Sequence, residues 1–283
     1  MVIICTNPFR DIGFKYTKTV KEKLEYEGQE VKICPVFAHA GNDAIPKDLI
    51  VHDVKTAAKN CDLVVVIGGD GTLLNVTRLI KELSLPILGI NLGTKGFLMS
   101  LESDEIDYII KAAKGEYTLS RRMMLDVSLV RDNIIILSDC ALNDVVIHGY
   151  GDCITVNAST CGTTVTEFSG DGIIIATPTG STGYSLSAGG PIAEPESENI
   201  IISPICAHMI GARSHVLSPN RIISIDTKIV YTRKAFLSVD GNPVADIQNG
   251  DSIVVKRSAH YTNIVDLGLR SFYETTLGKL VNL

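Results

Sequence analysis

The sequence reads Leu63-Val-Val-Val-Ile-Gly-Gly-Asp-Gly-Thr72 at the place that decides its fold. The first half is an uninterrupted apolar run, which is typical of a strand buried on both faces of a parallel sheet. Three glycines follow within four positions, and they allow a tight turn and a close backbone approach to a ligand. A helical pattern over residues 73–83 comes next. The stretch therefore predicts a strand, a glycine-rich turn and a helix, the unit from which parallel α/β sheets are built.

The segments around this stretch alternate in the same way. Apolar residues recur every four positions from Ile12 to Leu24, after Asp11, which can cap a helix. Strands are predicted at residues 2–5, 31–36, 63–67 and 86–90, and helices at 12–24, 49–59, 73–83 and 104–114. We expect an α/β N-terminal domain over residues 1–103, with a Rossmann-like parallel sheet and helices on both faces.

Beyond about residue 115 the pattern changes to short β-rich runs separated by turn residues. Asp171-Gly172, Asp240-Gly241 and Asn249-Gly250 are pairs that favour tight turns between strands. Strands are predicted at residues 124–130, 134–137, 141–147, 154–156, 163–168, 173–176, 222–225, 236–239 and 253–256. We expect a β-rich, sandwich-like C-terminal domain over residues 104–267. A last helix is predicted at 271–280, in a segment, 268–283, that packs back on the first domain.

Composition and charge narrow the classes of protein. Hydrophobic residues make up 45% and charged residues 20%, and the net charge is −6. These values are typical of a globular chain, and the acidic balance disfavours a nucleic-acid partner. The seven cysteines contain no C-x-x-C pair, and no apolar stretch reaches the length of a membrane span. We expect a soluble cytoplasmic protein with reduced thiols and neither a nucleic-acid nor a membrane partner.

The glycine-rich turn is the strongest candidate site. The backbone of Gly68, Gly69 and Thr72 lies where a helix N-terminus offers amides to a phosphate. Asp70 would repel a phosphate, so its presence favours a role in holding a metal ion or accepting a proton. The alternative is a helix N-cap. Neither G-x-x-x-x-G-K-[ST] nor an opening G-x-G-x-x-G is present, which disfavours a Walker-type ATPase and a simple dehydrogenase.

Three further polar clusters follow predicted strands. In Gly89–Leu98, Phe97 can stack on a ring or pack in the core, and the pattern leaves both open. Asn143-Asp144 suits hydrogen bonds to a base edge or ribose hydroxyls, although turn chemistry is the preferred explanation of the pair taken alone. The loop from Gly170 to Pro191 is dense in hydroxyls and glycine and contains Tyr184, an aromatic that can stack on a ligand. A loop of this length inside a domain favours a functional role.

Taken in order, these motifs resemble those of the NAD kinase family, which shares a superfamily with diacylglycerol kinases and phosphofructokinases. The resemblance covers essentially the whole chain and is weaker before residue 60. It departs from the family pattern at Asp144, Gly183 and Asn242, where the family usually has Glu, Ala and Gln. The motifs that carry it are Gly68–Thr72, Asn91–Gly93, Gly96–Leu98, Asn143-Asp144, Asp171-Gly172, Thr177–Thr182 with Tyr184-Ser185, Asp240–Asn242 and Ser271–Tyr273.

The resemblance implies transfer of a phosphoryl group from ATP to the 2′-hydroxyl of the adenosine ribose in NAD, which gives NADP. It implies that Asp70 is the proton acceptor and lies near Mg²⁺ or another divalent metal. It also implies a homo-oligomer, a dimer or a tetramer, that binds small-molecule nucleotides. The implied substrate contacts are Asp70, Gly71, Phe97, Asn143, Asp144, Ile154, Ser169, Asp171, Thr182, Gly183, Tyr184, Ser185, Leu186, Ser187 and Asn242. A lipid kinase of the same superfamily and a non-catalytic NAD(P)-binding sensor are the alternatives.

Overall fold

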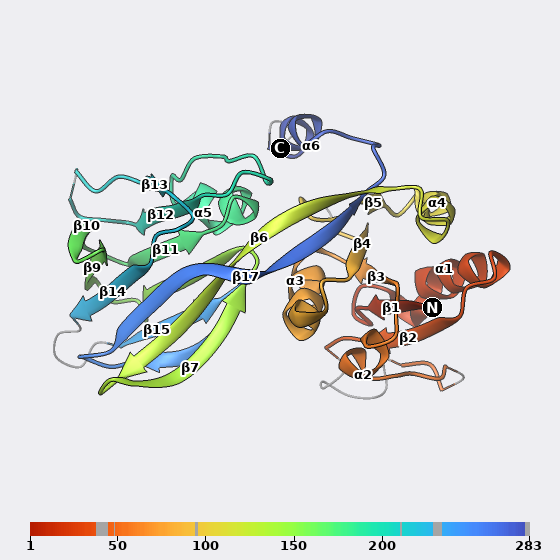
Figure 1. Cartoon of the computed structure of the whole chain (residues 1–283), viewed down its shortest axis with the longest axis horizontal. Coiled ribbons are helices and arrows are strands. Elements are labelled where there is room, and N and C mark those ends of the chain that lie inside the picture. Colours follow the sequence, from red (N-terminus) through yellow and green to blue (C-terminus); the bar gives the residue numbers. More distant parts are fainter. Residues whose placement is uncertain (38–44, 48, 94–95, 210, 229–233, 281–283) are drawn as a thin grey trace. The chain divides into compact units, whose positions relative to one another are not determined.

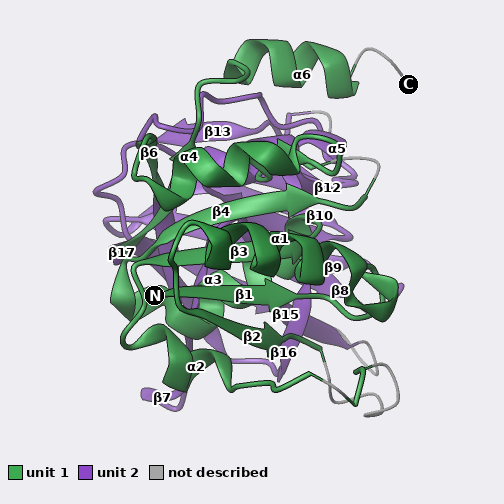
Figure 2. Cartoon of the chain, turned by 90° about the vertical axis from the view of Figure 1, so that its right-hand side faces the viewer, with its two compact units in different colours: residues 1–122, 260–283 green, residues 123–259 purple. Residues whose placement is uncertain are grey.

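The computed structural model describes residues 1–37, 45–47, 49–93, 96–209, 211–228 and 234–280 (Figure 1). By its internal contacts the chain divides into two compact units, residues 1–122 with 260–283 and residues 123–259 (Figure 2). The first unit therefore extends past residue 103, since it includes the helix around residue 110. No helix in the described ranges is long and apolar enough to cross a membrane.

A parallel sheet forms the centre of the first unit. Its strands are β1 (Val2–Thr6), β2 (Val31–Pro35), β3 (Leu63–Gly68) and β4 (Pro86–Asn91), in the order β2-β1-β3-β4. Every neighbouring pair is parallel, as the continuous apolar runs predict. Short β5 (Leu101–Glu102) and the last residues of β17 (Ser252–Asp266) also run parallel to β4.

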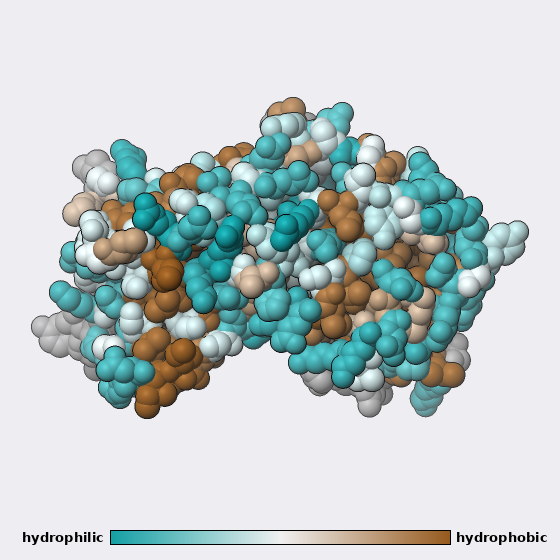
Figure 3. Space-filling model, in the orientation of Figure 1, coloured by the Kyte–Doolittle hydropathy of each residue, from teal (hydrophilic) through white to brown (hydrophobic). Residues whose placement is uncertain are grey.

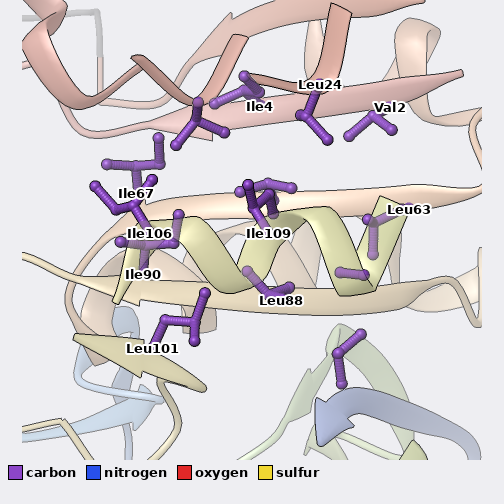
Figure 4. Packing of buried hydrophobic residues seen from close by; sticks show 14 residues of the cluster. Val2, Ile4, Leu24, Leu63, Ile67, Leu88, Ile90, Leu101, Ile106 and Ile109 are labelled. Atoms are coloured by element: carbon purple, nitrogen blue, oxygen red, sulfur yellow. The ribbon is translucent and has the colours of Figure 1, made fainter. Parts of the chain in front are cut away.

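Helices cover this sheet. Two of them, α1 (Lys15–Tyr26) and α4 (Ile109–Ala113), pack against each other, as do α2 (Val54–Ala58) and α3 (Asp70–Ile80). The cluster in Figure 4 joins Leu24 of α1 and Ile109 of α4 to alternate residues of the strands, such as Ile4 and Leu88. Each strand thus buries one set of side chains against α1 and α4, as expected for a sheet covered by helices. Short 3-10 turns lie at Ile12–Phe14, Lys81–Leu83 and Ile106–Tyr108, and α6 (Phe272–Leu280) is the last helix.

Helix α2 of the first unit is shorter than its pattern predicts. The helix expected over residues 49–59 begins only at Val54, where α2 starts. Asp53 caps it by accepting a hydrogen bond from the backbone N–H of Thr56 at 2.9 Å. Just before the cap, the backbone N–H of His52 bonds to the carbonyl of Ile33, so this segment runs beside β2 as extended chain.

The second unit is built almost entirely of antiparallel strands. One sheet has the order β13-β12-β11-β8-β15-β16, and the other includes β10-β9-β14-β17, with β6 beside β17 and β7 beside β6. This is the antiparallel sandwich that the turn spacing predicts. The strands are β6 (Thr118–Arg131), β7 (Ile134–Ala141), β8 (Asp144–Gly149), β9 (Ile154–Thr160), β10 (Thr163–Gly170), β11 (Gly172–Ala176), β12 (Ile200–Ile205), β13 (His215–Leu217), β14 (Ile223–Lys228), β15 (Ala235–Val239) and β16 (Asn242–Ile247).

Two expectations for this unit are wrong in detail, and three of its strands were missed. The strand expected over residues 141–147 is interrupted, because β7 ends at Ala141 and β8 begins at Asp144. Asp171-Gly172 is not a hairpin turn: Gly172 starts β11, and a Cβ there would lie 2.1 Å from the Ile147 carbonyl oxygen. The glycine is thus required by the close approach of β8. Strands β12, β13 and β16 were not predicted.

Candidate functional site

Three strands of the first unit end close together at the same edge of the sheet. Asn7 follows β1, Gly68 ends β3 and Asn91 ends β4. The side-chain amide of Asn7 donates to the Thr72 hydroxyl at 3.3 Å, and the backbone N–H of Leu92 donates to the Gly68 carbonyl at 2.6 Å. This is the carboxyl edge, where open α/β sheets bind ligands. Asn7 was not predicted as a site residue, although its position two residues after the predicted strand 2–5 is a usable signal.

Asp70 is the first residue of α3 and does not cap it, because Gly69 occupies the N-cap position. Its carboxylate accepts hydrogen bonds from the backbone N–H groups of Phe97 at 2.8 Å and Leu98 at 3.2 Å. The N-cap interpretation is therefore wrong, and Asp70 instead fixes the loop after β4. Residues 94 and 95 of that loop lie outside the described residues.

Two further side chains contribute charge next to Asp70. Glu102 accepts a hydrogen bond from the side-chain amide of Asn91 at 2.7 Å, and the Lys279 ammonium lies 3.4 Å from its other oxygen. Burial raises the pKa of the Asp70 carboxyl above its usual value, and Glu102 raises it as well. Hydrogen bonds from the loop and the charge of Lys279 act in the opposite direction. The result is a carboxylate that is a better proton acceptor than an ordinary aspartate.

The rest of the glycine-rich turn is open to a ligand. Gly71 is exposed and Gly69 is half-buried, whereas Gly68 and Thr72 are buried. The turn leads directly into α3, whose N-terminus favours an anion such as phosphate. Phe97 is half-buried, with the Lys279 nitrogen 5.9 Å from the centre of its ring. The structure thus brings Asp70, the glycine turn and Phe97 together in the first unit.

In the second unit, Asp240 shapes the turn that carries Asn143 and Asp144. Its carboxylate accepts hydrogen bonds from the backbone N–H groups of Leu142 at 2.8 Å, Asn143 at 2.7 Å and Asp144 at 3.1 Å. These bonds break the strand predicted over residues 141–147 into β7 and β8. The sequence placed Asp240 in a turn but did not predict this anchoring contact.

Asn143 and Asp144 both place buried polar atoms at this turn. The side-chain oxygen of Asn143 is buried and has no hydrogen-bond partner among the described residues. Asp144 is 6% exposed. Burial, followed by the charge of Asp240, raises the pKa of the Asp144 carboxyl to about 7. Burial likewise raises the pKa of Asp240 to about 6, although its three backbone hydrogen bonds lower it.

The hydroxyl-rich loop from Gly170 to Pro191 is hydrogen-bonded to the turn that contains Asn143. The backbone N–H of Thr177 donates to the Asn143 carbonyl at 2.9 Å, and the Thr177 hydroxyl donates to the Leu142 carbonyl at 2.6 Å. A Cβ at Gly180 would lie 2.1 Å from the Asn143 carbonyl oxygen, so only glycine fits there. A Cβ at Gly183 would lie 3.7 Å from the Asn143 amide nitrogen. The loop therefore lies directly against Asn143.

The side chains around Gly183 differ in how far they are exposed to solvent. Tyr184 is 42% exposed, and its pKa is raised first by burial and then by the nearby charges of Cys206, Asp171 and Asp144. Thr182 and Leu186 are half-buried and Ser187 is exposed.

Four other residues expected at the site are buried or contact other residues of the second unit through their side chains. Ser185 is buried and its hydroxyl lies 2.9 Å from that of Ser203. Ile154 is 1% exposed, so its side chain belongs to the core. Ser169 lies across the strand pair from Thr155, with their hydroxyls 2.9 Å apart. The side-chain amide of Asn242 donates to the carbonyl of Asp240 at 3.2 Å.

A parallel sheet that gathers a glycine-rich turn and a half-buried carboxylate at its carboxyl edge defines a nucleotide-binding protein of the α/β class. Residues 9–117 match the ATP-NAD kinase N-terminal domain, and residues 142–267 match the ATP-NAD kinase C-terminal domain. The chain belongs to the ATP-NAD kinase family.

Two relatives are similar in sequence over 78% and 98% of this chain. A protein of Ruminiclostridium cellulolyticum named NAD kinase is 37% identical over 280 residues, which cover 98% of this chain and 96% of that protein. A NAD kinase of Geotalea daltonii is 41% identical over 225 residues, 78% of this chain and 79% of that protein.

Two solved structures are similar in fold. The yeast NADH kinase complexed with NADH has a TM-score of 0.85 at 25% identity, covering 100% of this chain and 87% of that chain. The NAD kinase from Archaeoglobus fulgidus in complex with ATP has a TM-score of 0.75 at 25% identity, covering 100% of both chains. The α/β and β-sandwich architecture expected from sequence is thus confirmed as that of the family.

Proposed function

We propose that this chain is an ATP-dependent NAD kinase that phosphorylates the 2′-hydroxyl of the adenosine ribose of NAD and forms NADP. The observation that carries the proposal is the Asp70 carboxylate, held by the loop after β4 at the start of a phosphate-binding turn. Family membership and relatives named NAD kinase at 37% and 41% identity support the reaction.

Asp70 is proposed as the group that accepts the proton of the ribose hydroxyl. A sugar hydroxyl is a weak nucleophile, so a carboxylate within hydrogen-bond reach assists its attack on the terminal phosphate of ATP. The raised pKa of Asp70 suits this task, because a base works best when its pKa approaches the working pH. The backbone N–H groups of Phe97 and Leu98 fix its orientation, and the glycine turn beside it receives the phosphates.

The turn built on Asp240 is proposed to hold NAD. The buried oxygen of Asn143 lacks a partner among the described residues and can accept a hydrogen bond from a ligand. Asp144, with a pKa near 7, can donate a hydrogen bond when protonated and accept one when ionised. Tyr184 offers an exposed ring for stacking. We propose that Gly183, Thr182, Asp171 and the loop to Ser187 complete this binding surface.

We propose that a divalent metal binds in the first unit together with the phosphates of ATP and has no separate protein site. Within the described ranges no cluster of three or more His, Cys, Asp or Glu side chains could hold a metal. Both oxygens of Asp70 already accept backbone hydrogen bonds. Mg²⁺ commonly binds through one or two carboxylates together with substrate phosphates, and Asp70 could supply one such ligand. Bound in this way, the metal would neutralise charge on the transferred phosphoryl group.

The chain is also proposed to act in the cytoplasm as a homo-oligomer. Ile134, Ile135 and Ile136 of β7 are 65%, 61% and 47% exposed. Apolar surface gathers around this part of the second unit (Figure 3). Three consecutive exposed isoleucines favour an interface between subunits, since such patches are uncommon on monomers.

Incubation with ATP, NAD and Mg²⁺ tests the reaction, with NADP measured by a NADP-specific dehydrogenase. We expect the wild-type chain to form NADP. Asp70→Asn is expected to lose at least about 100-fold in kcat while it still binds NAD, because general-base assistance contributes about that much. The matched control is Asp226→Asn, which neutralises an exposed carboxylate in the second unit. Wild-type turnover in Asp70→Asn would remove this residue from the mechanism.

A further inference from the structure

The phosphate-binding turn lies beside two carboxylates, Asp70 and Glu102. Anionic phosphates placed there would be repelled unless a cation lies close by. The described residues of the turn itself, Gly68 to Thr72, include no lysine or arginine, and no P-loop lysine motif is present in the sequence. A cation from another part of the chain would offset this charge together with a metal bound to the phosphates.

The C-terminal helix α6 brings a cation to this place. The Lys279 ammonium donates a hydrogen bond to the Gly96 carbonyl and lies 3.4 Å from Glu102. It is also near enough to Asp70 to act on its charge. Gly96 directly precedes the two residues whose N–H groups hold Asp70. Lys279 thus binds a carbonyl of the same loop whose N–H groups hold Asp70. Lys279 and Gly96 are 183 residues apart in sequence.

The orientation of α6 makes this contact unusual. No described side chain of the helix is fully buried. Tyr273 and Leu277 are 62% and 63% exposed, yet the side chain of Lys279 is only 19% exposed. A helix that packs for stability buries its apolar residues and leaves its lysines in water. Here the charged side chain points inward, so packing alone does not explain its position.

The start of α6 is also fixed. Ser271 and Glu274 form a capping box, in which the backbone N–H of Ser271 donates to Glu274 and that of Glu274 donates to the Ser271 hydroxyl. Just before it, Arg270 pairs with Glu105. The capping box and this ion pair thus fix the N-terminal end of α6. They thereby set the direction of the helix axis towards Lys279.

We propose that Lys279 contacts the phosphates of ATP on the glycine turn, so that α6 completes the phosphate-binding site. An ammonium has three N–H donors, and within the described ranges Gly96 and Glu102 account for two of them. The third can bind a phosphate oxygen, and the positive charge offsets the two carboxylates. The inference rests on the proposed function for the identity of the nucleotide.

Calorimetric titration with ATP, AMP and adenosine distinguishes phosphate binding by Lys279 from a purely structural role. In the structural role, which we call a tether, Lys279 only holds α6 against the loop after β4. Lys279→Met keeps an unbranched side chain of similar length and removes the charge. We expect about a 10- to 100-fold loss in ATP affinity, a smaller loss for AMP and little change for adenosine. Lys279→Arg, which keeps the charge, is expected to recover part of the ATP affinity. Lys59→Met is the control, because Lys59 is exposed in the same unit.

An equal loss for ATP and adenosine in Lys279→Met would show a tether and overturn the inference. Unchanged ATP affinity in that variant would overturn it too, as would a wild-type chain that binds ATP no better than adenosine. Melting temperatures of all variants report whether they are folded. No step of this test needs NAD or turnover, so a failure of the proposed reaction remains distinguishable from a failure of the Lys279 contact.

Discussion

Asp144→Asn provides a sharp test of the electrostatics in the second unit. The Asp144 carboxyl has a pKa of about 7 in the folded chain, raised from its ordinary value of 3.8 by burial and by the charge of Asp240. A shift of about three units corresponds to about 4 kcal/mol against the charged form. Asparagine has nearly the same shape and cannot ionise, so the variant removes this penalty.

The sign of the pH dependence follows from which state binds more protons. Between about pH 4 and pH 7 the folded chain keeps Asp144 protonated, whereas the unfolded chain has released the proton. The contribution of Asp144 to the free energy of unfolding is therefore complete below its pKa in the unfolded chain. It is lost as the pH rises through its pKa in the folded chain. Asp144 alone should lower the free energy of unfolding by about 2 to 3 kcal/mol between pH 5 and pH 8.

Urea unfolding at pH 5, 6, 7 and 8 measures this effect. We expect the wild-type chain to become less stable across the series, and Asp144→Asn to show a shallower dependence and to exceed the wild type by about 2 to 4 kcal/mol at pH 8. Asp226→Asn should follow the wild type, since Asp226 is exposed. If Asp144→Asn were no more stable than the wild type at pH 8, the assignment of a buried, charge-coupled carboxyl would be refuted.

Three further predictions concern stability and thiol reactivity. Gly180→Ala should lose about 3 kcal/mol in urea unfolding, because its Cβ would lie 2.1 Å from the Asn143 carbonyl oxygen, and a loss below about 1 kcal/mol would contradict that contact. Arg131→Met should be less stable than the wild type in the same assay, because it removes the arginine that donates two bonds of 2.7 Å to Asp251, which is 2% exposed; stability equal to wild type would show that this ion pair does not stabilise the fold. Burial raises the pKa of the Cys34 thiol to about 12, so Cys34 should react with a disulfide reagent at pH 8 far more slowly than the exposed thiols, and a rate equal to theirs would exclude its burial.

Local patterns explain which features the sequence could predict. The apolar run 63–67 and the glycines after it define a strand and a turn within ten residues, and the structure has both there. Asn143 and Asp144 were singled out because they adjoin an apolar run. Both signals come from neighbours along the chain, so they can be read without a fold.

The unpredicted contacts join distant parts of the chain. Asp240 binds Leu142, Asn143 and Asp144 across 96 to 98 residues, and Lys279 reaches Gly96 across 183. Single-sequence patterns carry no information on such pairs. The strand Ile200–Ile205 was missed although its run is apolar; it contains Pro204, which argues against a strand in a sheet interior.

Phosphorus NMR of a mixture of the chain with ATP, NAD and Mg²⁺ tests the proposed reaction most directly. The account predicts that ATP is converted to ADP while a new phosphomonoester signal appears, coupled to the 2′ proton of the adenosine ribose. Formation of ADP and inorganic phosphate without that signal would mean hydrolysis rather than transfer to NAD. An unchanged spectrum would contradict the proposed kinase activity itself.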